Sequence, residues 1–359
     1  MKRFIKAFAA LFFATCMLAG CADSNASTTE GNGVKSGEKK SVVVTIFPEY
    51  DWVRSIIGDC KDNYDLTMLL DNGVDLHSYQ PTAVDIAKIA ECDMFIYVGG
   101  ESDEWVEDAL SEAVNKDMQV LNLLEILGDS VKEEEIKEGM EHEDGDEDHD
   151  HEHEDGDEDH DHEHEDGDED HDHEHHHGEE PEMDEHVWLS LKNASVICSS
   201  IEQALEKIDP DNADTFKANL SGYVDKLNAL DAKYADAASS APVKTLLFGD
   251  RFPFRYLVDD YGLDYYAAFV GCSAESEASF ETIVFLSGKV DELGLKHIMT
   301  IESSDGKIAN TIIENTAAKD QDVLMLDSMQ STTSKNVADG ATYLSVMEKN
   351  LEVLQNALN

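Results

Sequence analysis

The chain has 359 residues, with 79 acidic and 26 basic side chains and a formal net charge of −53 at pH 7. This balance argues against nucleic-acid binding, because such binding requires a basic surface that neutralises phosphates. The acidity is concentrated: 27 of the acidic side chains lie in residues 141–185, a window without Lys or Arg.

The first twenty residues have the organisation of a secretory signal peptide. Three basic residues precede an apolar run, FAALFFATCMLAG, that is too short for a membrane span. Residues 18–21, Leu-Ala-Gly-Cys, resemble a bacterial lipobox, so we expect residues 1–20 to be removed and Cys21 to carry a lipid. A plain signal peptide with a chance cysteine is the alternative. Residues 21–40 are small and polar, which suits a flexible tether.

Residues 41–127 alternate short β-branched runs with segments of helical periodicity. Strands are expected at residues 41–47, 66–70, 93–99 and 119–123, and helices near residues 51–57, 82–91 and 103–114. This alternation predicts a parallel sheet covered by helices, which forms an N-terminal lobe.

Residues 128–185 form an acidic, histidine-rich insertion. The eleven-residue unit HEDGDEDHDHE occurs three times from His142 onward and is followed by three more histidines. A segment with so little to bury cannot offset its chain entropy, so we expect a disordered, solvated loop that gathers zinc as an accessory or is only a solvated insertion. The HExxH at residues 173–177 matches a zinc-protease motif, but it lies in a biased tract without helical apolar periodicity and is better explained as coincidence.

The remaining chain is expected to supply a linking helix and a second lobe. Within residues 186–243, apolar side chains recur every three or four positions between Asn212 and Ala238, which predicts one rigid helix about 40 Å long. In residues 244–359, strands are expected at 244–249, 263–270, 296–301 and 322–327, and helices near 252–261, 279–293, 307–319 and 340–356. The predicted fold is α/β, with two (βα)4 lobes of parallel sheets and a ligand cleft between them at the carboxyl ends of the strands.

Four cysteines remain after the lipobox: Cys60, Cys92, Cys198 and Cys272. A location outside the cytoplasm permits disulfides, and the sequence leaves open whether Cys60 and Cys92 pair. No CxxC spacing is present, so the cysteine pattern supports neither a thiolate zinc site nor a thioredoxin-type motif.

Three residues at or after predicted strand ends, or beside the insertion, are candidate metal ligands. His77 lies in the loop after residues 66–70, His186 follows the histidine-rich tract, and Asp327 ends the last strand. Imidazole nitrogens and a carboxylate suit a divalent ion such as zinc or manganese. Any one of them alone is more often structural, and their joint placement at lobe edges strengthens the prediction.

The segments GVDLHSYQPTAVDIAKIAECDMFIYVGG, DEHVWLSLKNA and VLMLDSMQS resemble the metal-receptor lipoproteins of zinc and manganese ABC transporters. The resemblance covers about residues 41–357 and includes the linking helix and the histidine-rich insertion, a feature of the zinc-type members. It implies that His77, His186 and Asp327 are metal ligands.

One position departs from the family pattern. Where the family places its third ligand, in a motif of the form His-Asp-Ala-Phe-x-Tyr-Leu, this chain has Arg251, preceded by Asp250. Arginine is always cationic and cannot bind a metal. Asp250, a water molecule or a loop histidine could replace the missing ligand, and we favour Asp250. Arg251 could pair with Asp327 or another carboxylate. Glu302 matches a recurrent acidic position of the family and is a candidate outer partner.

The resemblance therefore implies a receptor, not an enzyme, which is anchored through Cys21 to the outer face of the bacterial cytoplasmic membrane. It would capture Zn²⁺ and deliver it, as a monomer, to an ABC permease driven by a separate ATPase. Metal affinity should fall below about pH 6 as imidazoles become protonated. A manganese receptor and a surface metal buffer or adhesin remain alternatives. A metallohydrolase is disfavoured because no positioned general base accompanies the ligands.

Overall fold

The computed structural model describes residues 39–141, 182–273 and 277–359. The predicted signal peptide, Cys21, most of the tether and the histidine-rich repeats lie outside these described residues. Among the helices that are described, none combines the length and the apolar character needed to cross a membrane.

The N-terminal lobe is a parallel four-stranded sheet with the order β2-β1-β3-β4. Val42, Val43 and Val44 of β1 are almost completely buried, as expected for a parallel strand covered on both faces. The strands are β1 (Lys40–Val44), β2 (Tyr64–Met68), β3 (Met94–Tyr97) and β4 (Gln119–Asn122), and the helices are α1 (Phe47–Ile57), α2 (Ala83–Glu91), α3 (Trp105–Ser111) and α4 (Leu123–Leu127).

The C-terminal lobe repeats this arrangement with the order β6-β5-β7-β8, again all parallel. In both lobes the first strand is central and the second lies at an edge. The strands are β5 (Thr245–Phe252), β6 (Asp264–Val270), β7 (His297–Thr300) and β8 (Asp322–Met325), and the helices are α7 (Arg255–Tyr261), α8 (Phe280–Leu293), α9 (Lys307–Asn315), α10 (Ser334–Ala338) and α11 (Tyr343–Ala357). The predicted two-lobed α/β fold is confirmed.

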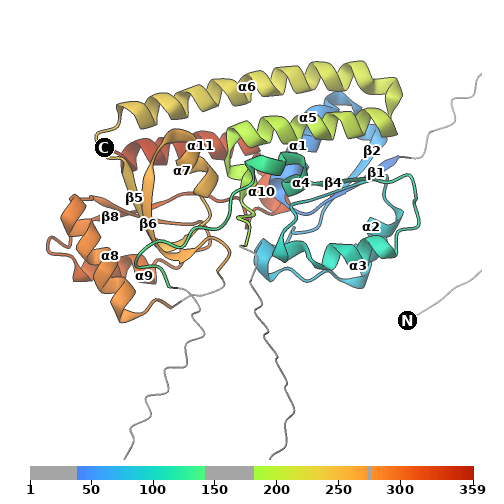
Figure 1. Ribbon diagram of the computed structural model, residues 1–359. Coiled ribbons are helices and arrows are strands. Elements are labelled where there is room, and N and C mark those ends of the chain that lie inside the picture. Colours follow the sequence, from blue (N-terminus) through green and yellow to red (C-terminus); the bar gives the residue numbers. More distant parts are fainter. Residues whose placement is uncertain (1–38, 142–181, 274–276) are drawn as a thin grey trace, which may run out of the picture. The chain divides into compact units, whose positions relative to one another are not determined.

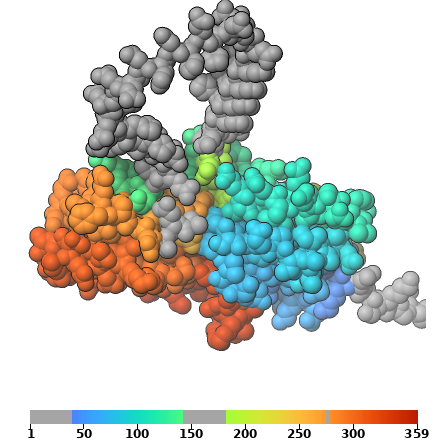
Figure 2. Space-filling model, turned by 90° about the horizontal axis from the view of Figure 1, so that it is seen from below, coloured from blue at the N-terminus to red at the C-terminus, as the bar shows by residue number. Residues whose placement is uncertain are grey.

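Two long helices connect the lobes. α5 (Leu191–Ile208) is followed, after a short turn that contains Pro210, by α6 (Ala213–Ser240). α6 has 28 residues, about 42 Å at 1.5 Å per residue, which confirms the long linking helix. It packs against α1 and α5 of one half and α7 and α11 of the other, and Figure 1 shows it running past both sheets. In Figure 2 the N-terminal lobe, blue to teal, lies beside the orange and red C-terminal lobe.

The start of α1 differs from the prediction. The sequence indicated a strand to residue 47 and a helix from residue 51, but β1 ends at Val44 and α1 begins at Phe47. The buried carboxylate of Glu49 accepts hydrogen bonds from the backbone N–H groups of Thr45 (2.8 Å) and Ile46 (3.1 Å). The side chain of Glu49, the third residue of α1, thus caps the N-terminus of the helix, so α1 begins earlier than the apolar pattern suggests.

The insertion is also shorter than predicted, because its two ends are part of the folded structure. Residues 128–141 and 182–185 are described, and they are joined by an antiparallel bridge between Glu133 and Met183. Met140 and Asp184 are buried. These partners are distant in sequence, so local composition could not reveal them.

Cys60 and Cys92, whose pairing the sequence left open, are both free thiols. The Cys60 thiol donates to Oδ1 of Asn212 at 3.4 Å, and Cys92 contacts the sulfur of Met118 at 3.3 Å. Cys60 therefore contacts the turn between α5 and α6, whereas Cys92 contacts the residue before β4.

Candidate metal centre

His77 lies in the long connection that follows β2. Asp75 starts a short 3-10 turn (Leu76–Ser78) by accepting a hydrogen bond from the His77 N–H at 3.1 Å. The His77 side chain is only 7% exposed, and its Nδ1 lies 2.7 Å from Oγ of Ser102. Glu185 lies slightly farther from the same nitrogen, with Oε2 at 3.5 Å. The hydrogen-bond network thus assigns the ring proton to Nδ1 and leaves Nε2 as an acceptor.

His186 lies directly before the short 3-10 turn Val187–Leu189 that leads into α5. It is completely buried, and Oδ1 of Asp184 accepts hydrogen bonds from both its backbone N–H (2.9 Å) and its Nδ1 (3.0 Å). The backbone carbonyl of Asp184 in turn accepts from the Tyr256 hydroxyl at 2.7 Å. A carboxylate behind the imidazole fixes the ring orientation and raises the basicity of the other nitrogen, an arrangement typical of metal-binding histidines.

The two histidines meet through these free nitrogens. Nε2 of His77 lies 3.1 Å from Nε2 of His186. Two nitrogens bound to one tetrahedral zinc ion at about 2.0–2.1 Å are roughly 3.3 Å apart. The two lobe-edge residues selected from the sequence are therefore already spaced for a shared ion.

Within the described part of the chain, these histidines form a group with Cys272 in which one potential ligand atom of each residue lies within 4.8 Å of the others. Cys272 follows β6 at the carboxyl edge of the C-terminal sheet. Cys272 was not predicted as a ligand, because the cysteines were weighed only as a possible Cys60–Cys92 disulfide and for CxxC spacing. The available signal was its place two residues after a strand end, in the segment CSAESEAS.

Asp327 and Asp250 do not join this group. Asp327 lies beyond the end of β8, and its Oδ1 accepts a hydrogen bond from the Met329 N–H at 2.8 Å. Asp250 lies near the end of β5, where Oδ1 accepts from the Arg251 N–H at 3.0 Å while Oδ2 is buried without a hydrogen-bond partner. Among the described residues, the compact ligand group therefore contains His77 and His186 of the expected set, and the roles of Asp327 and Asp250 stay predictions.

Arg251 pairs with Asp75, not with Asp327. Its Nη1 also donates to the backbone carbonyl of Ser273 at 3.3 Å. The arginine at the family's ligand position thus connects the loop of His77 to the segment that carries Cys272.

Glu302, the candidate outer partner, organises the loop after β8. Its carboxylate accepts from the Ser328 N–H (2.8 Å) and hydroxyl, and from the Gln330 and Ser331 N–H groups (3.1 and 3.3 Å). Burial, followed by the nearby charge of Glu302, raises the pKa of Asp327 to about 6.

The two histidines have different proton affinities. Burial and the neighbouring His186 lower the pKa of His77 to about 3. Burial alone would also lower the pKa of His186, but the carboxylates of Asp184, Glu185 and Asp75 outweigh it and raise this pKa above its ordinary value. His77 is therefore neutral at physiological pH, and proton competition with a metal acts mainly at His186.

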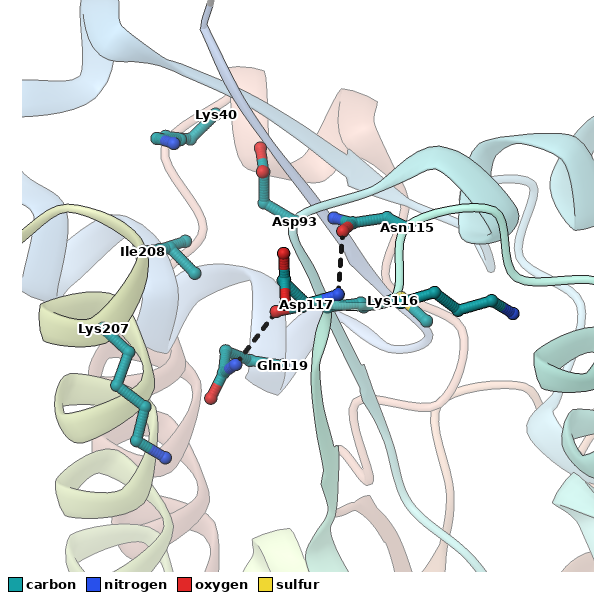
Figure 3. Close-up of a pocket in the computed structure, with 9 residues that line it drawn as sticks. Lys40, Asp93, Asn115, Lys116, Asp117, Gln119, Lys207 and Ile208 are labelled. Atoms are coloured by element: carbon teal, nitrogen blue, oxygen red, sulfur yellow. Dashed lines mark hydrogen bonds between the residues drawn. The ribbon is translucent and has the colours of Figure 1, made fainter.

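A surface pocket on the N-terminal lobe lies away from the two histidines. This pocket of about 610 Å³ lies at the amino ends of β1 and β4, with Lys40, Asp93 and Gln119 among its lining residues (Figure 3). His77 lies at the opposite, carboxyl edge of this sheet. The pocket therefore plays no part in the arrangement of the histidines.

The profile of the family described as zinc-uptake complex component A, periplasmic, matches residues 42–357. The chain belongs to this family. This confirms the resemblance stated from the sequence motifs. A high-affinity zinc uptake system protein, ZnuA of Bacillus subtilis, is 30% identical over 354 residues, 98% of each chain.

A second relative is longer than this chain. The zinc-binding protein AdcA of Streptococcus pyogenes serotype M3 is 30% identical over 331 residues, which cover 91% of this chain but only 58% of that protein. The crystal structure of the Zn(II)-bound ZnuA-like domain of Streptococcus pneumoniae AdcA matches 89% of this chain and 99% of that domain, with 27% identity and a TM-score of 0.63. The chain therefore spans about three-fifths of the curated AdcA proteins it matches and corresponds to their ZnuA-like part.

Proposed function

We propose that this chain is an extracytoplasmic receptor that captures Zn²⁺ between its lobes and delivers it to an ABC permease driven by a separate ATPase. The observation that carries the proposal is the 3.1 Å approach of the two Nε2 atoms. Each ring is held from its other nitrogen, by Ser102 for His77 and by Asp184 for His186. Two acceptor nitrogens facing each other in a buried site are stabilised by a cation placed between them.

The choice of zinc over manganese follows from the donor atoms. Imidazole nitrogen suits zinc, whereas manganese favours carboxylates and water. The compact ligand group that the described residues form consists of His77, His186 and Cys272 and includes neither Asp327 nor Asp250, which supports the choice of zinc. The names of the relatives, a zinc-binding protein and a zinc uptake protein, point in the same direction.

The cellular arrangement is part of the proposal. Membership of a periplasmic uptake family and similarity to a zinc-binding lipoprotein of Streptococcus pneumoniae support an extracytoplasmic lipoprotein. We further propose that Cys21 carries the lipid, that the receptor acts as a monomer, and that the histidine-rich repeats gather zinc for the cleft. A binding protein of an uptake complex performs no chemical conversion, so no enzymatic role is proposed.

The test is metal titration of the metal-free protein against a chelator of known affinity, with Zn²⁺ and Mn²⁺ in competition. We expect one tight zinc equivalent that is lost in His77→Ala and His186→Ala. His297→Ala is the matched control, because this third histidine of the folded body begins β7 at the amino edge of its sheet. Preference for Mn²⁺ would overturn the choice of metal.

Deletion of residues 142–181 separates the receptor from a metal buffer or adhesin. If the cleft is the functional site, one tight zinc equivalent survives the deletion, while weaker equivalents disappear. Loss of all zinc binding in the deletion variant would contradict the receptor proposal. The sequence-derived ligand Asp327 is tested in parallel as Asp327→Ala, which should have a smaller effect than either histidine variant.

A further inference from the structure

We propose that the thiolate of Cys272 is a third protein ligand of the captured zinc ion, together with Nε2 of His77 and of His186. This inference rests on the proposed function, because the ion is the receptor's cargo. Its geometric basis is that one potential ligand atom of each residue lies within 4.8 Å of those of the other two, and all three residues are among those that the structure describes. The ligands come from three separate segments: the loop after β2, the start of α5 and the end of β6.

The distances are close to those of a tetrahedral site. With Zn–N bonds of about 2.0–2.1 Å and a Zn–S bond of about 2.3 Å, the N···N edge is roughly 3.3 Å and each N···S edge roughly 3.6 Å. The two Nε2 atoms are 3.1 Å apart, and the sulfur lies within 4.8 Å of a ring nitrogen of each histidine. Completing the site therefore needs side-chain movements that bring the N···S distances to roughly 3.6 Å within a group of residues that the fold already gathers.

The backbone just before Cys272 passes close to the His186 ring. The Cys272 N–H donates to Oε1 of Glu134 at 2.9 Å. At the preceding residue, Gly271, a Cβ atom would lie 2.9 Å from the Phe252 carbonyl oxygen and 3.0 Å from Cε1 of His186. Only glycine permits this close approach, so the residue before the cysteine is the one that lets the strand end reach the imidazole.

One competing carboxylate, that of Asp75, is already engaged. Oδ1 of Asp75 lies 4.0 Å from Nε2 of His77, but this carboxylate is paired with Arg251. Arg251 cannot bind a metal itself. By joining Asp75 to the carbonyl of Ser273, it holds the loop of the first histidine beside the segment that carries Cys272. Arg251, which stands where the family has a ligand, thus links the segment of His77 to the segment of Cys272.

A two-nitrogen, one-sulfur ligand set has a consequence for metal choice. Thiolate is a soft donor that favours zinc and disfavours manganese. On binding, the Cys272 thiol releases its proton to solvent and the sulfur forms the bond to the ion, so each zinc captured displaces one thiol proton. The fourth tetrahedral position is left to water, as in zinc sites with three protein ligands.

The test uses the full-length protein with Co²⁺ as a spectroscopic probe of the zinc site. A cobalt–thiolate bond produces a charge-transfer band in the near ultraviolet, which histidine and carboxylate ligands do not. The histidine-rich repeats contain no cysteine, so cobalt bound there cannot produce the band. We expect the band in the wild-type protein and its loss in Cys272→Ser. The matched control is Cys60→Ser, a free, half-buried cysteine outside the ligand group, which should keep the band.

Chelator competition with zinc supplies the second readout. Cys272→Ser should weaken zinc binding by more than the roughly 10–100-fold that loss of an outer partner costs. Thermal unfolding of the metal-free variant checks that it still folds. If zinc binds tightly through the histidines but the wild type shows no thiolate band, or Cys272→Ser keeps it, the cysteine proposal fails and the receptor stands. If His77→Ala and His186→Ala keep full affinity, the proposed function itself fails.

Discussion

Replacement of Asp184 by Asn tests how the His186 imidazole is oriented. Oδ1 of Asp184 accepts two hydrogen bonds from His186, from the backbone N–H at 2.9 Å and from Nδ1 at 3.0 Å. Asn keeps an acceptor oxygen in this position but removes the negative charge. Loss of such an outer partner typically weakens metal binding by about 10–100-fold, or roughly 1.4–2.7 kcal/mol. Because the acceptor oxygen is retained, we expect the loss of zinc affinity in Asp184→Asn to be near the lower end of this range.

The pH dependence adds a sharper expectation. Asp184 raises the pKa of His186 against the effect of burial, so in the wild type zinc displaces a proton from His186 at mildly acidic pH. Without this carboxylate the pKa of His186 falls, and proton competition weakens. The affinity gap between wild type and Asp184→Asn should therefore be widest at neutral pH and narrow as the pH falls.

The assay is chelator competition for zinc across this pH range, with chemical denaturation as the folding control. Ser102→Ala is the matched variant for the other histidine. It should cost less affinity, because Oε2 of Glu185 lies 3.5 Å from the same His77 nitrogen and can replace the lost acceptor. Equal affinities for Asp184→Asn and wild type, or a larger loss in Ser102→Ala, would refute the assigned roles.

Three further outcomes are expected. Gly271→Ala should cost about 1–3 kcal/mol of unfolding free energy and weaken zinc binding, because its Cβ would press on the His186 ring; unchanged affinity in a chelator competition would contradict this. Burial raises the pKa of Glu49 to about 8, so ionising this carboxyl group destabilises the fold. The free energy of unfolding should therefore fall by up to about 1.4 kcal/mol for each unit by which the pH rises between about 4.5 and 8. Denaturant titrations at several pH values should show that Glu49→Gln removes this loss of stability. If the unfolding free energies of wild type and variant changed in parallel with pH, the assigned role of Glu49 would be wrong. Arg251→Leu should lower the melting temperature of the metal-free protein, because it leaves the Asp75 carboxylate unpaired. Added zinc should raise the melting temperature of this variant by more than it raises that of the wild type.

The motifs predicted the site in part. His77 and His186 could be selected because each lies at a lobe edge in a recognisable segment, and the structure brings their nitrogens together. Asp327 was selected for the same reason; its Oδ1 accepts a hydrogen bond from the Met329 N–H, and its role as a ligand stays a prediction. Which way a loop carboxylate points depends on the neighbours it finds, and these belong to chain segments remote from it in sequence.

Local periodicity by itself determined the order of strands and helices, the two parallel sheets and the long α6, because each depends on patterns within a few turns of chain. Only the tertiary structure decided that residues 128–141 are part of the fold, that Arg251 pairs with Asp75, and that Cys272 lies beside the two histidines. Each of these depends on a partner far away in the chain. The sequence names the donor atoms, but the packing of two lobes selects which of them can meet around one ion.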